Sequence, residues 1–158
     1  MNRARSLDVV GALARLGLAA VWLVSGLLKV VDPDQTYIAV RAYDVLPDAG
    51  VEVVAALLPW VELALGVLLL AGVGTRLVAA LSAVLLLAFV AGVGQAWARG
   101  LSIDCGCFGG GGAVEAGETT YVQELVRDTG FLLMAGWLAV RPRTLLALDD
   151  RLGTRRMG

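Results

Sequence analysis

The stretch that decides the fold is residues 77–98, LVAALSAVLLLAFVAGVGQAWA, which contains no charged side chain. A helix rises about 1.5 Å per residue, so a helix of this length crosses the roughly 30 Å of hydrocarbon in a bilayer. A soluble domain has to cover its surface with polar groups, and this run has almost none to offer. The run therefore predicts a membrane-spanning helix.

The composition of the whole chain agrees with a single membrane domain over residues 1–158. Of 158 residues 58% are hydrophobic and only 17% are charged, and the mean hydropathy is +0.78. This composition excludes an ordinary water-soluble enzyme. The chain has no histidine, which excludes His-ligated haem, His-bearing zinc sites and Ser/His or Cys/His catalysis. No basic stripe with interleaved aromatic residues is present, so we expect lipid and not nucleic acid as a partner.

Three further apolar runs predict spans, which gives four in all: about 9–31, 51–72, 77–98 and 120–140. We therefore expect an all-α, integral membrane four-helix bundle. The first run ends at Asp32-Pro33-Asp34, where the proline and the flanking acids stop a helix. That run is too long for a cleaved signal peptide, and no small-residue cleavage site precedes its end.

The second and fourth runs are less regular. Pro59 is expected either to kink the second helix or to begin its straight part. The uncharged part of the fourth run, residues 129–140, is too short to span a bilayer. The fourth helix must therefore include the preceding turns, which hold Glu124, Arg127 and Asp128.

Orientation follows from the distribution of basic residues. One side of the predicted spans collects Arg3, Arg5, Arg76, Arg141, Arg143, Arg151, Arg155 and Arg156. By the positive-inside rule both termini are cytoplasmic, and residues 141–158 form a basic cytoplasmic tail. Segments 32–50 and 99–121 then face outward from the cytoplasmic (inner) membrane. Within the first of these, residues 37–42 predict a short interfacial helix after the first span, ended by Leu46-Pro47.

Cys105 and Cys107 are the only cysteines, and Gly106 separates them on the predicted outer side. Phe108 and four glycines, Gly109 to Gly112, follow. Bridged cysteines need Cα atoms about 4.4–6.8 Å apart, which a turn can provide, and glycine permits the backbone angles of such a tight ring. A strained, exposed disulfide is easily reduced, and a loop of one residue gains little entropy from closure. The pair therefore predicts electron shuttling and not a structural staple.

Two alternatives to this redox interpretation remain. A metal site built on two thiolates would need carboxylates or a second subunit, because histidine is absent, so we expect no metal. Inert thiols are disfavoured, because structural cysteines usually stand singly in apolar surroundings whereas these lie beside Asp104 in a glycine-rich loop. Either cysteine could be the one that attacks a partner.

Several motifs together resemble a known family. They are Val24 to Lys29 before Asp32-Pro33, Tyr43 to Pro47, Leu58 to Glu62 with Gly66 and Gly72, Asp104 to Gly109, and Arg127-Asp128. This set, which covers about residues 15–140, resembles the DoxX-like superfamily, and within it the MauE (methylamine utilisation) branch of redox-associated membrane proteins. The Cys-Gly-Cys-Phe-Gly element is the most specific part. The resemblance implies a four-helix membrane bundle that supports disulfide formation or thiol redox balance outside the cytoplasm, beside a thioredoxin-like partner.

Charges inside the predicted spans form a second group of candidate site residues. Lys29 and Glu62 should face the bundle interior and be paired, because an isolated charge in hydrocarbon is costly. Glu62 lies about 15 Å into its helix, so the two can meet only if that helix is displaced or begins near Pro59. Arg127 and Asp128 enter the fourth helix from the outer side and could complete a polar cluster beneath the cysteine loop, where a cation favours thiolate. The alternative is that these charges only fix helix register.

These features predict a membrane thiol–disulfide oxidoreductase whose cysteine pair exchanges electrons with an extracytoplasmic thioredoxin-like partner. By analogy with other four-helix membrane oxidases of dithiols, a quinone held among the outer halves of the helices would carry the electrons away. The alternative hypothesis is a non-catalytic membrane scaffold that recruits or stabilises a redox enzyme. A transporter is disfavoured, because the four short spans show no repeat and no pair of broken helices.

Overall fold

A computed structural model describes residues 3–115, 117–142, 144, 147 and 148. Its elements are α1 (Arg3–Val31), α2 (Pro33–Ala42), α3 (Asp48–Ala71), α4 (Thr75–Ala98), β1 (Ile103–Asp104), β2 (Gly112–Ala113) and α5 (Tyr121–Val140). The expectation of a mostly helical protein is confirmed. By length and composition, three helices in the described part of the chain could cross a membrane: Arg5–Val31, Asp48–Ala71 and Thr75–Ala98.

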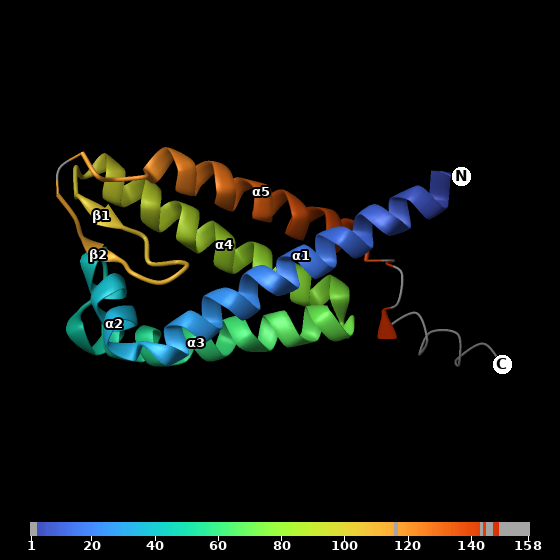
Figure 1. The fold of residues 1–158 in the computed structure, drawn as a ribbon, viewed down its shortest axis with the longest axis horizontal. Helices are drawn as coiled ribbons and strands as arrows, with labels where there is room; N and C mark the ends of the chain where they lie inside the picture. Colours follow the sequence, from blue (N-terminus) through green and yellow to red (C-terminus); the bar gives the residue numbers. More distant parts are fainter. Residues whose placement is uncertain (1–2, 116, 143, 145–146, 149–158) are drawn as a thin grey trace.

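The four long helices pack mainly as two pairs, α1 against α3 and α4 against α5. Figure 1 shows that the start of α1, the α3–α4 turn and the end of α5 lie at one end of the molecule, whereas α2 and the β1–β2 hairpin lie at the other. Small residues allow α1 and α3 to approach closely. A methyl group at Gly26 would lie 2.9 Å from the Pro59 carbonyl oxygen, and one at Gly66 would lie 2.7 Å from Leu23 Cγ.

The Asp32-Pro33-Asp34 sequence both ends one helix and begins the next. α1 ends at Val31, where the sequence predicts its end. Asp32 then caps α2, because its Oδ1 accepts a hydrogen bond from the Gln35 backbone N–H at 3.0 Å, and Pro33 occupies the first helical position. The short helix expected over residues 37–42 is therefore present but begins four residues earlier.

α3 continues through Pro59 without interruption and ends at Ala71. The next residue, Gly72, has a φ of +68°, the left-handed conformation typical of a helix C-terminus. Arg15 Nη1 donates hydrogen bonds to the carbonyls of Leu69 at 2.7 Å and Leu70 at 3.0 Å. The Leu69 carbonyl also accepts the Gly72 backbone N–H at 3.1 Å. A charged side chain from α1 thus adds donors to the carbonyls of the last turn of α3, where the helix dipole is negative.

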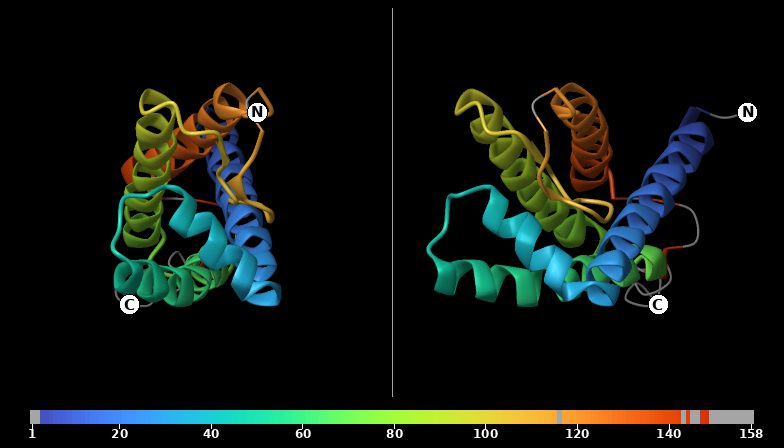
Figure 2. Two further views of the ribbon diagram at one scale, coloured as in Figure 1. Left: turned by 90° about the vertical axis from the view of Figure 1, so that its left-hand side faces the viewer. Right: turned by 60° about the vertical axis from the view of Figure 1, so that its left-hand side comes forward.

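The β1–β2 hairpin is a departure from the all-α expectation. Its two short strands are antiparallel, with Ile103 opposite Ala113 and Asp104 opposite Gly112. In the right-hand view of Figure 2, the loop between the strands lies between α1 and α5, which belong to different helix pairs. Most of the expected basic tail, residues 141–158, lies outside the described residues, although Arg141 forms a 3.1 Å ion pair with Asp8 near the start of α1.

Candidate functional site

Cys105 and Cys107 lie in the loop that the hairpin inserts between the helices. Both are free thiols, and their exposed fractions are only 8% and 7%. The prediction that the two cysteines are exposed is therefore wrong. The turn depends on glycine, because Gly106 has φ +68° and a methyl group there would lie 2.7 Å from Ala39 Cβ on α2. Glycine at position 106 thus has two causes, the tight turn and the close packing of the loop against α2.

The two thiols are electrostatically unequal. The Cys107 backbone N–H donates to Cys105 Sγ at 3.4 Å. The pKa of Cys105 is lowered mainly by a hydrogen bond from the Cys107 side chain, with further help from this N–H and from Arg127, against the opposing effect of burial. The same side-chain bond, together with burial, raises the pKa of Cys107 well above its ordinary value. Cys105 is therefore the cysteine that forms a thiolate more readily.

Arg127, at the second turn of α5, supplies the cation beside this sulfur. Its Nη2 lies 3.7 Å from Cys105 Sγ, and its Nε donates to Asp128 Oδ1 at 3.0 Å. The guanidinium also lies over the Phe108 ring, 4.9 Å from the ring centre. The carboxylate and the aromatic ring hold the guanidinium against the thiol, so the structure brings together the Arg127, Asp128 and Phe108 that the sequence singled out.

Glu124 is a buried site residue that the sequence reasoning left out of the site. Its Oε1 accepts hydrogen bonds from Thr120 Oγ1 at 3.0 Å and from the Cys105 backbone N–H at 3.5 Å. Glu124 is four residues before Asp128, so the helical period already places both on one face. Asp104, Cys105 and Glu124 also offer ligand atoms within 4.8 Å of one another, a set of one sulfur and two oxygens that is one ligand short of a tetrahedral metal site.

Lys29 and Glu62 form an ion pair of 3.0 Å at the other side of the loop. Lys29 Nζ also donates to the Cys107 carbonyl at 3.0 Å, and Ser25 Oγ donates to the same oxygen at 2.6 Å. Ser25, which the sequence reasoning did not include in the site, lies one turn before Lys29 on α1. The backbone of Cys107 is therefore anchored to buried polar groups of the α1–α3 pair.

α2 and Tyr43, the residue that directly follows it, also hold the loop. Tyr43 donates its hydroxyl to the Cys105 carbonyl at 3.2 Å, and Gln35 Nε2 donates to the Gly111 carbonyl at 2.6 Å. Tyr43 was also absent from the predicted site, although it lies in the stretch 43–47 that carries part of the family resemblance. The carbonyls of both cysteines are thus fixed by side chains from other elements.

Comparison with known proteins identifies the family. Residues 7–141 match the family model described as methylamine utilisation protein MauE. The chain belongs to the MauE family. A curated relative, the methylamine utilization protein MauE of Paracoccus denitrificans, is 39% identical over 98 residues, which cover 61% of this chain and 53% of the relative. The chain thus spans about half the length of this curated MauE relative.

No solved structure matches the chain. The match confirms the MauE part of the sequence resemblance, and membership of the wider DoxX-like superfamily stays a prediction.

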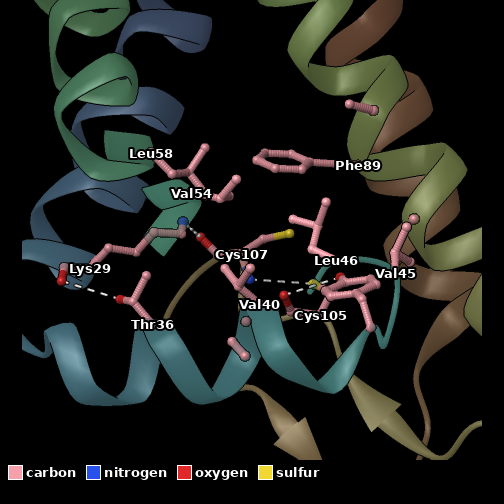
Figure 3. A pocket seen from close by; sticks show the side chains of 15 residues that line it. Lys29, Thr36, Val40, Val45, Leu46, Val54, Leu58, Phe89, Cys105 and Cys107 are labelled. Carbon is pink, nitrogen blue, oxygen red and sulfur yellow. Dashed lines mark hydrogen bonds between the residues drawn. The ribbon is translucent and has the colours of Figure 1, made fainter. Parts of the chain in front are cut away.

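In this member of the MauE family, the cysteine pair lines two cavities of opposite character. One, here called the apolar cavity, has a volume of about 320 Å³ and lies among α2, α3, α4 and the loop (Figure 3). The other, here called the polar cavity, has a volume of about 350 Å³ and lies between the loop and α5. Its walls include Asp104, Glu124 and Arg127. The two sulfurs can therefore be approached from two directions that suit different chemistries.

Proposed function

We propose that this MauE-family protein is a membrane thiol–disulfide redox protein whose Cys105 and Cys107 exchange electrons with an extracytoplasmic thioredoxin-like partner. The observation that carries the proposal is the 3.7 Å contact between Arg127 Nη2 and Cys105 Sγ, beside Cys107, whose backbone N–H donates to the same sulfur. One thiolate favoured by a cation, with a resolving thiol next to it, is the arrangement that disulfide exchange requires.

The exchange runs through Cys105. In the direction that reduces the partner, the Cys105 thiolate attacks a partner disulfide, a mixed disulfide forms, and the second partner sulfur leaves as a thiolate. Cys107 then loses its proton and attacks the Cys105 sulfur, which forms the Cys105–Cys107 bond and releases the partner's remaining thiolate. Two electrons have moved from the pair to the partner. The same steps in reverse oxidise the partner and reduce the pair.

The polar cavity provides the route for the partner. Both cysteines are buried, so a partner sulfur has to enter through a space that reaches them. This cavity does so between the loop and the first turns of α5, and its lining includes Gln123, Thr120 and the Arg127 side chain. Polar walls suit an extended, hydrated active-site segment of a soluble protein better than they suit lipid.

We further infer that α1, α3, α4 and α5 all span the inner membrane, with the cysteine loop on its outer side. α5 qualifies in spite of its charges, because Glu124 and Asp128 are buried against the loop. The opposite face of α5 exposes large apolar side chains: Val122, Val126, Leu133 and Val140. Arg5, Arg76 and Arg141 lie toward the end of the molecule opposite α2 and the hairpin, which supports a cytoplasmic assignment for that end and an interfacial one for α2 (Figure 1).

Single-cysteine variants test the exchange. The probe is an oxidised thioredoxin-like protein, added to the full chain in detergent. Cys107→Ser should trap a mixed disulfide through Cys105 that is visible on a non-reducing gel, and Cys105→Ser should trap little or none. The double variant is the control for non-specific bonding. Equal trapping by both variants would refute the assignment of Cys105. If neither variant traps the probe and both support disulfide formation in cells as wild type does, a non-catalytic scaffold replaces the proposal.

A further inference from the structure

The cysteine pair forms a shared wall between the polar cavity, through which we expect the partner to approach, and the apolar cavity on its other side. An electron carrier that served a soluble partner alone would need only the first. We propose that the apolar cavity binds a membrane quinone, which accepts the two electrons of the Cys105–Cys107 dithiol. This inference rests on the proposed thiol–disulfide exchange and names the acceptor that returns the pair to the disulfide.

The walls of the apolar cavity suit a ring and not a hydrated ion. Aliphatic and aromatic side chains from three helices and from the α2–α3 connection surround it, and they include Val40, Leu46, Val54, Leu58 and Phe89. Figure 3 shows the Cys107 sulfur pointing into this space, between Phe89, Val40 and Leu46. A volume of about 320 Å³ lies in the range of small-molecule sites, which begins near 300 Å³. The sulfur thus faces a space in which a planar, apolar ring can lie beside it.

The polar groups at the edge of the apolar cavity are already engaged. Lys29 Nζ is bonded to Glu62 and to the Cys107 carbonyl, and Thr36 Oγ1 donates to the Asp32 carbonyl at 2.9 Å. The Tyr43 hydroxyl is bonded to the Cys105 carbonyl, and burial is the main cause that raises the pKa of this phenol, which therefore stays protonated. With these groups occupied, the thiols are the reactive groups that the cavity presents to a ligand.

The position of the apolar cavity favours a lipid-soluble ligand. Its walls include Val54 and Leu58 of α3 and Ala88 and Phe89 of α4, and both helices are long and apolar enough to cross a membrane. Val54 and Ala88 are at the same time exposed on the outside of the bundle. A ligand dissolved in the bilayer can therefore reach the cavity from the lipid side, whereas a water-soluble oxidant would have to cross an apolar wall.

The step balances as a two-electron, two-proton transfer. The S–H bonds of Cys105 and Cys107 are lost and one S–S bond forms between the two sulfurs. The two electrons and two protons convert the two carbonyls of the quinone into the two hydroxyls of the quinol. Cys107, whose raised pKa keeps it protonated, is the thiol that faces the cavity and can deliver its proton there. The Cys105–Cys107 disulfide also borders the polar cavity, where a partner dithiol reduces it again.

A direct test uses purified, quinone-free protein of full length, reduced and freed of reductant, with decylubiquinone as the probe. Ultraviolet absorbance reports quinone reduction, and mass analysis reports loss of the two thiols. We expect stoichiometric formation of quinol and disulfide. Ala88→Phe, which fills the cavity, should slow the reaction at least about ten-fold, whereas Ala91→Phe places the same group on the exposed side of α4, outside the cavity, and should match wild type.

A second measurement covers the case in which Ala88→Phe does not fold. Binding of decylubiquinone to wild-type protein should be displaced by a ring-bearing quinone analogue but not by a decyl chain without a ring. Equal displacement by the bare chain would overturn the proposal in favour of a lipid acyl chain. Equal rates of quinone reduction by Ala88→Phe and Ala91→Phe would also overturn it. Wild-type protein that traps the thioredoxin-like probe but leaves decylubiquinone oxidised would refute the quinone site alone. Reduction of decylubiquinone without trapping would support the site and refute the partner exchange.

Discussion

Lys29 Nζ lies 3.0 Å from Glu62 Oε2, although Lys29 is near the end of α1 and Glu62 is in the middle of α3. The contact is possible because the first turns of α3 lie beside α2, beyond the end of α1. Both side chains are almost completely buried, with exposed fractions of 7% and 0%. Since Lys29 also binds the Cys107 carbonyl, this ion pair ties the position of the cysteine loop to the packing of two helices.

Removal of one partner of this pair should be costly. Glu62→Gln leaves Lys29 charged and buried without a counter-ion, for which about 3–5 kcal/mol of unfolding free energy is the usual loss. The measurement is unfolding in mixed micelles with increasing denaturing detergent. Asp44→Asn is the matched control, because the Asp44–Arg99 pair of 2.8 Å is largely exposed and should be worth at most about 1 kcal/mol.

The double replacement Lys29→Met with Glu62→Leu removes both charges and should be more stable than Glu62→Gln alone. A loss in Glu62→Gln no larger than the loss in Asp44→Asn would show that Lys29 finds another partner or loses its proton at little cost.

Arg127 should control the pH at which Cys105 reacts. The guanidinium helps to lower the pKa of Cys105, so Arg127→Met should raise that pKa and move the pH profile of alkylation to higher pH. At a pH below both pKa values, the thiolate fraction falls about ten-fold when the pKa rises by one, and at a pH above both the difference disappears. The rate is measured with a small alkylating reagent and read at Cys105 by peptide mass.

Two comparisons give this pH experiment its controls. Arg127→Lys retains a cation and should restore part of the lost reactivity. Arg76→Gln removes an exposed arginine at the start of α4, at the opposite end of the molecule from the hairpin, and should leave the profile unchanged (Figure 1). Cys107, whose pKa is raised, should be labelled only at higher pH than Cys105 in the wild-type protein. Superimposed profiles for wild type and Arg127→Met would exclude a role of the guanidinium in activating the thiol.

The helices were predictable because their causes are local. An uncharged run such as residues 77–98 and a stop such as Asp32-Pro33-Asp34 act within a few residues of the chain, and α4 and the end of α1 follow them closely. The burial of Cys105 and Cys107 was not predictable in this way. Consecutive glycines are compatible with an exposed turn and also with close packing on another helix, and only the contact with Ala39 distinguishes the two.

In the site, too, features with local causes were predictable and features set by tertiary contacts were not. The sequence could place Lys29 and Glu62 in the bundle interior, because charges avoid lipid, but their pairing depends on how far α3 is offset along α1. Glu124 shares a helix face with Asp128, yet its bond to the Cys105 N–H depends on a loop that enters from a different part of the chain. Contacts of this kind are set by tertiary packing and leave no periodic signal in the sequence.

Arg15 should stabilise the end of α3. Arg15→Met removes the two hydrogen bonds from a charged donor to the Leu69 and Leu70 carbonyls, each worth about 1.5–3 kcal/mol, and should lower the unfolding free energy accordingly. Unfolding in mixed micelles measures the loss. Arg41→Gln is the control, because Arg41 is exposed and lies 3.9 Å from an equally exposed Asp48. Equal stability of the two variants would mean that water or other groups satisfy these carbonyls.

The packing of Gly106 against α2 can be separated from its backbone conformation by comparison with Gly100. Both glycines have φ +68°, so replacement by alanine costs each about 1–2 kcal/mol for the left-handed conformation. At Gly100 nothing lies within 4 Å of the added methyl group, whereas at Gly106 the methyl group would lie 2.7 Å from Ala39 Cβ and 3.1 Å from the Gly110 carbonyl oxygen. Gly106→Ala should therefore lose more unfolding free energy than Gly100→Ala. It should also speed alkylation of both cysteines in the native protein, because the loop has to move away from α2.

Ala39→Gly provides the decisive comparison for this steric contact. It removes the methyl group that Gly106→Ala would strike, so the double variant should regain part of the lost stability and part of the protection against alkylation. The reference for the double variant is Ala39→Gly alone, because glycine inside α2 has its own cost of about 1 kcal/mol. Against that reference, the deficit caused by Gly106→Ala should fall toward that of Gly100→Ala and exceed it only through the 3.1 Å contact with the Gly110 carbonyl oxygen. If Ala39→Gly brings no recovery, the contact with α2 does not hold the loop in place, and the anchoring of the cysteines rests on the bonds from Ser25, Lys29 and Tyr43 to their carbonyls.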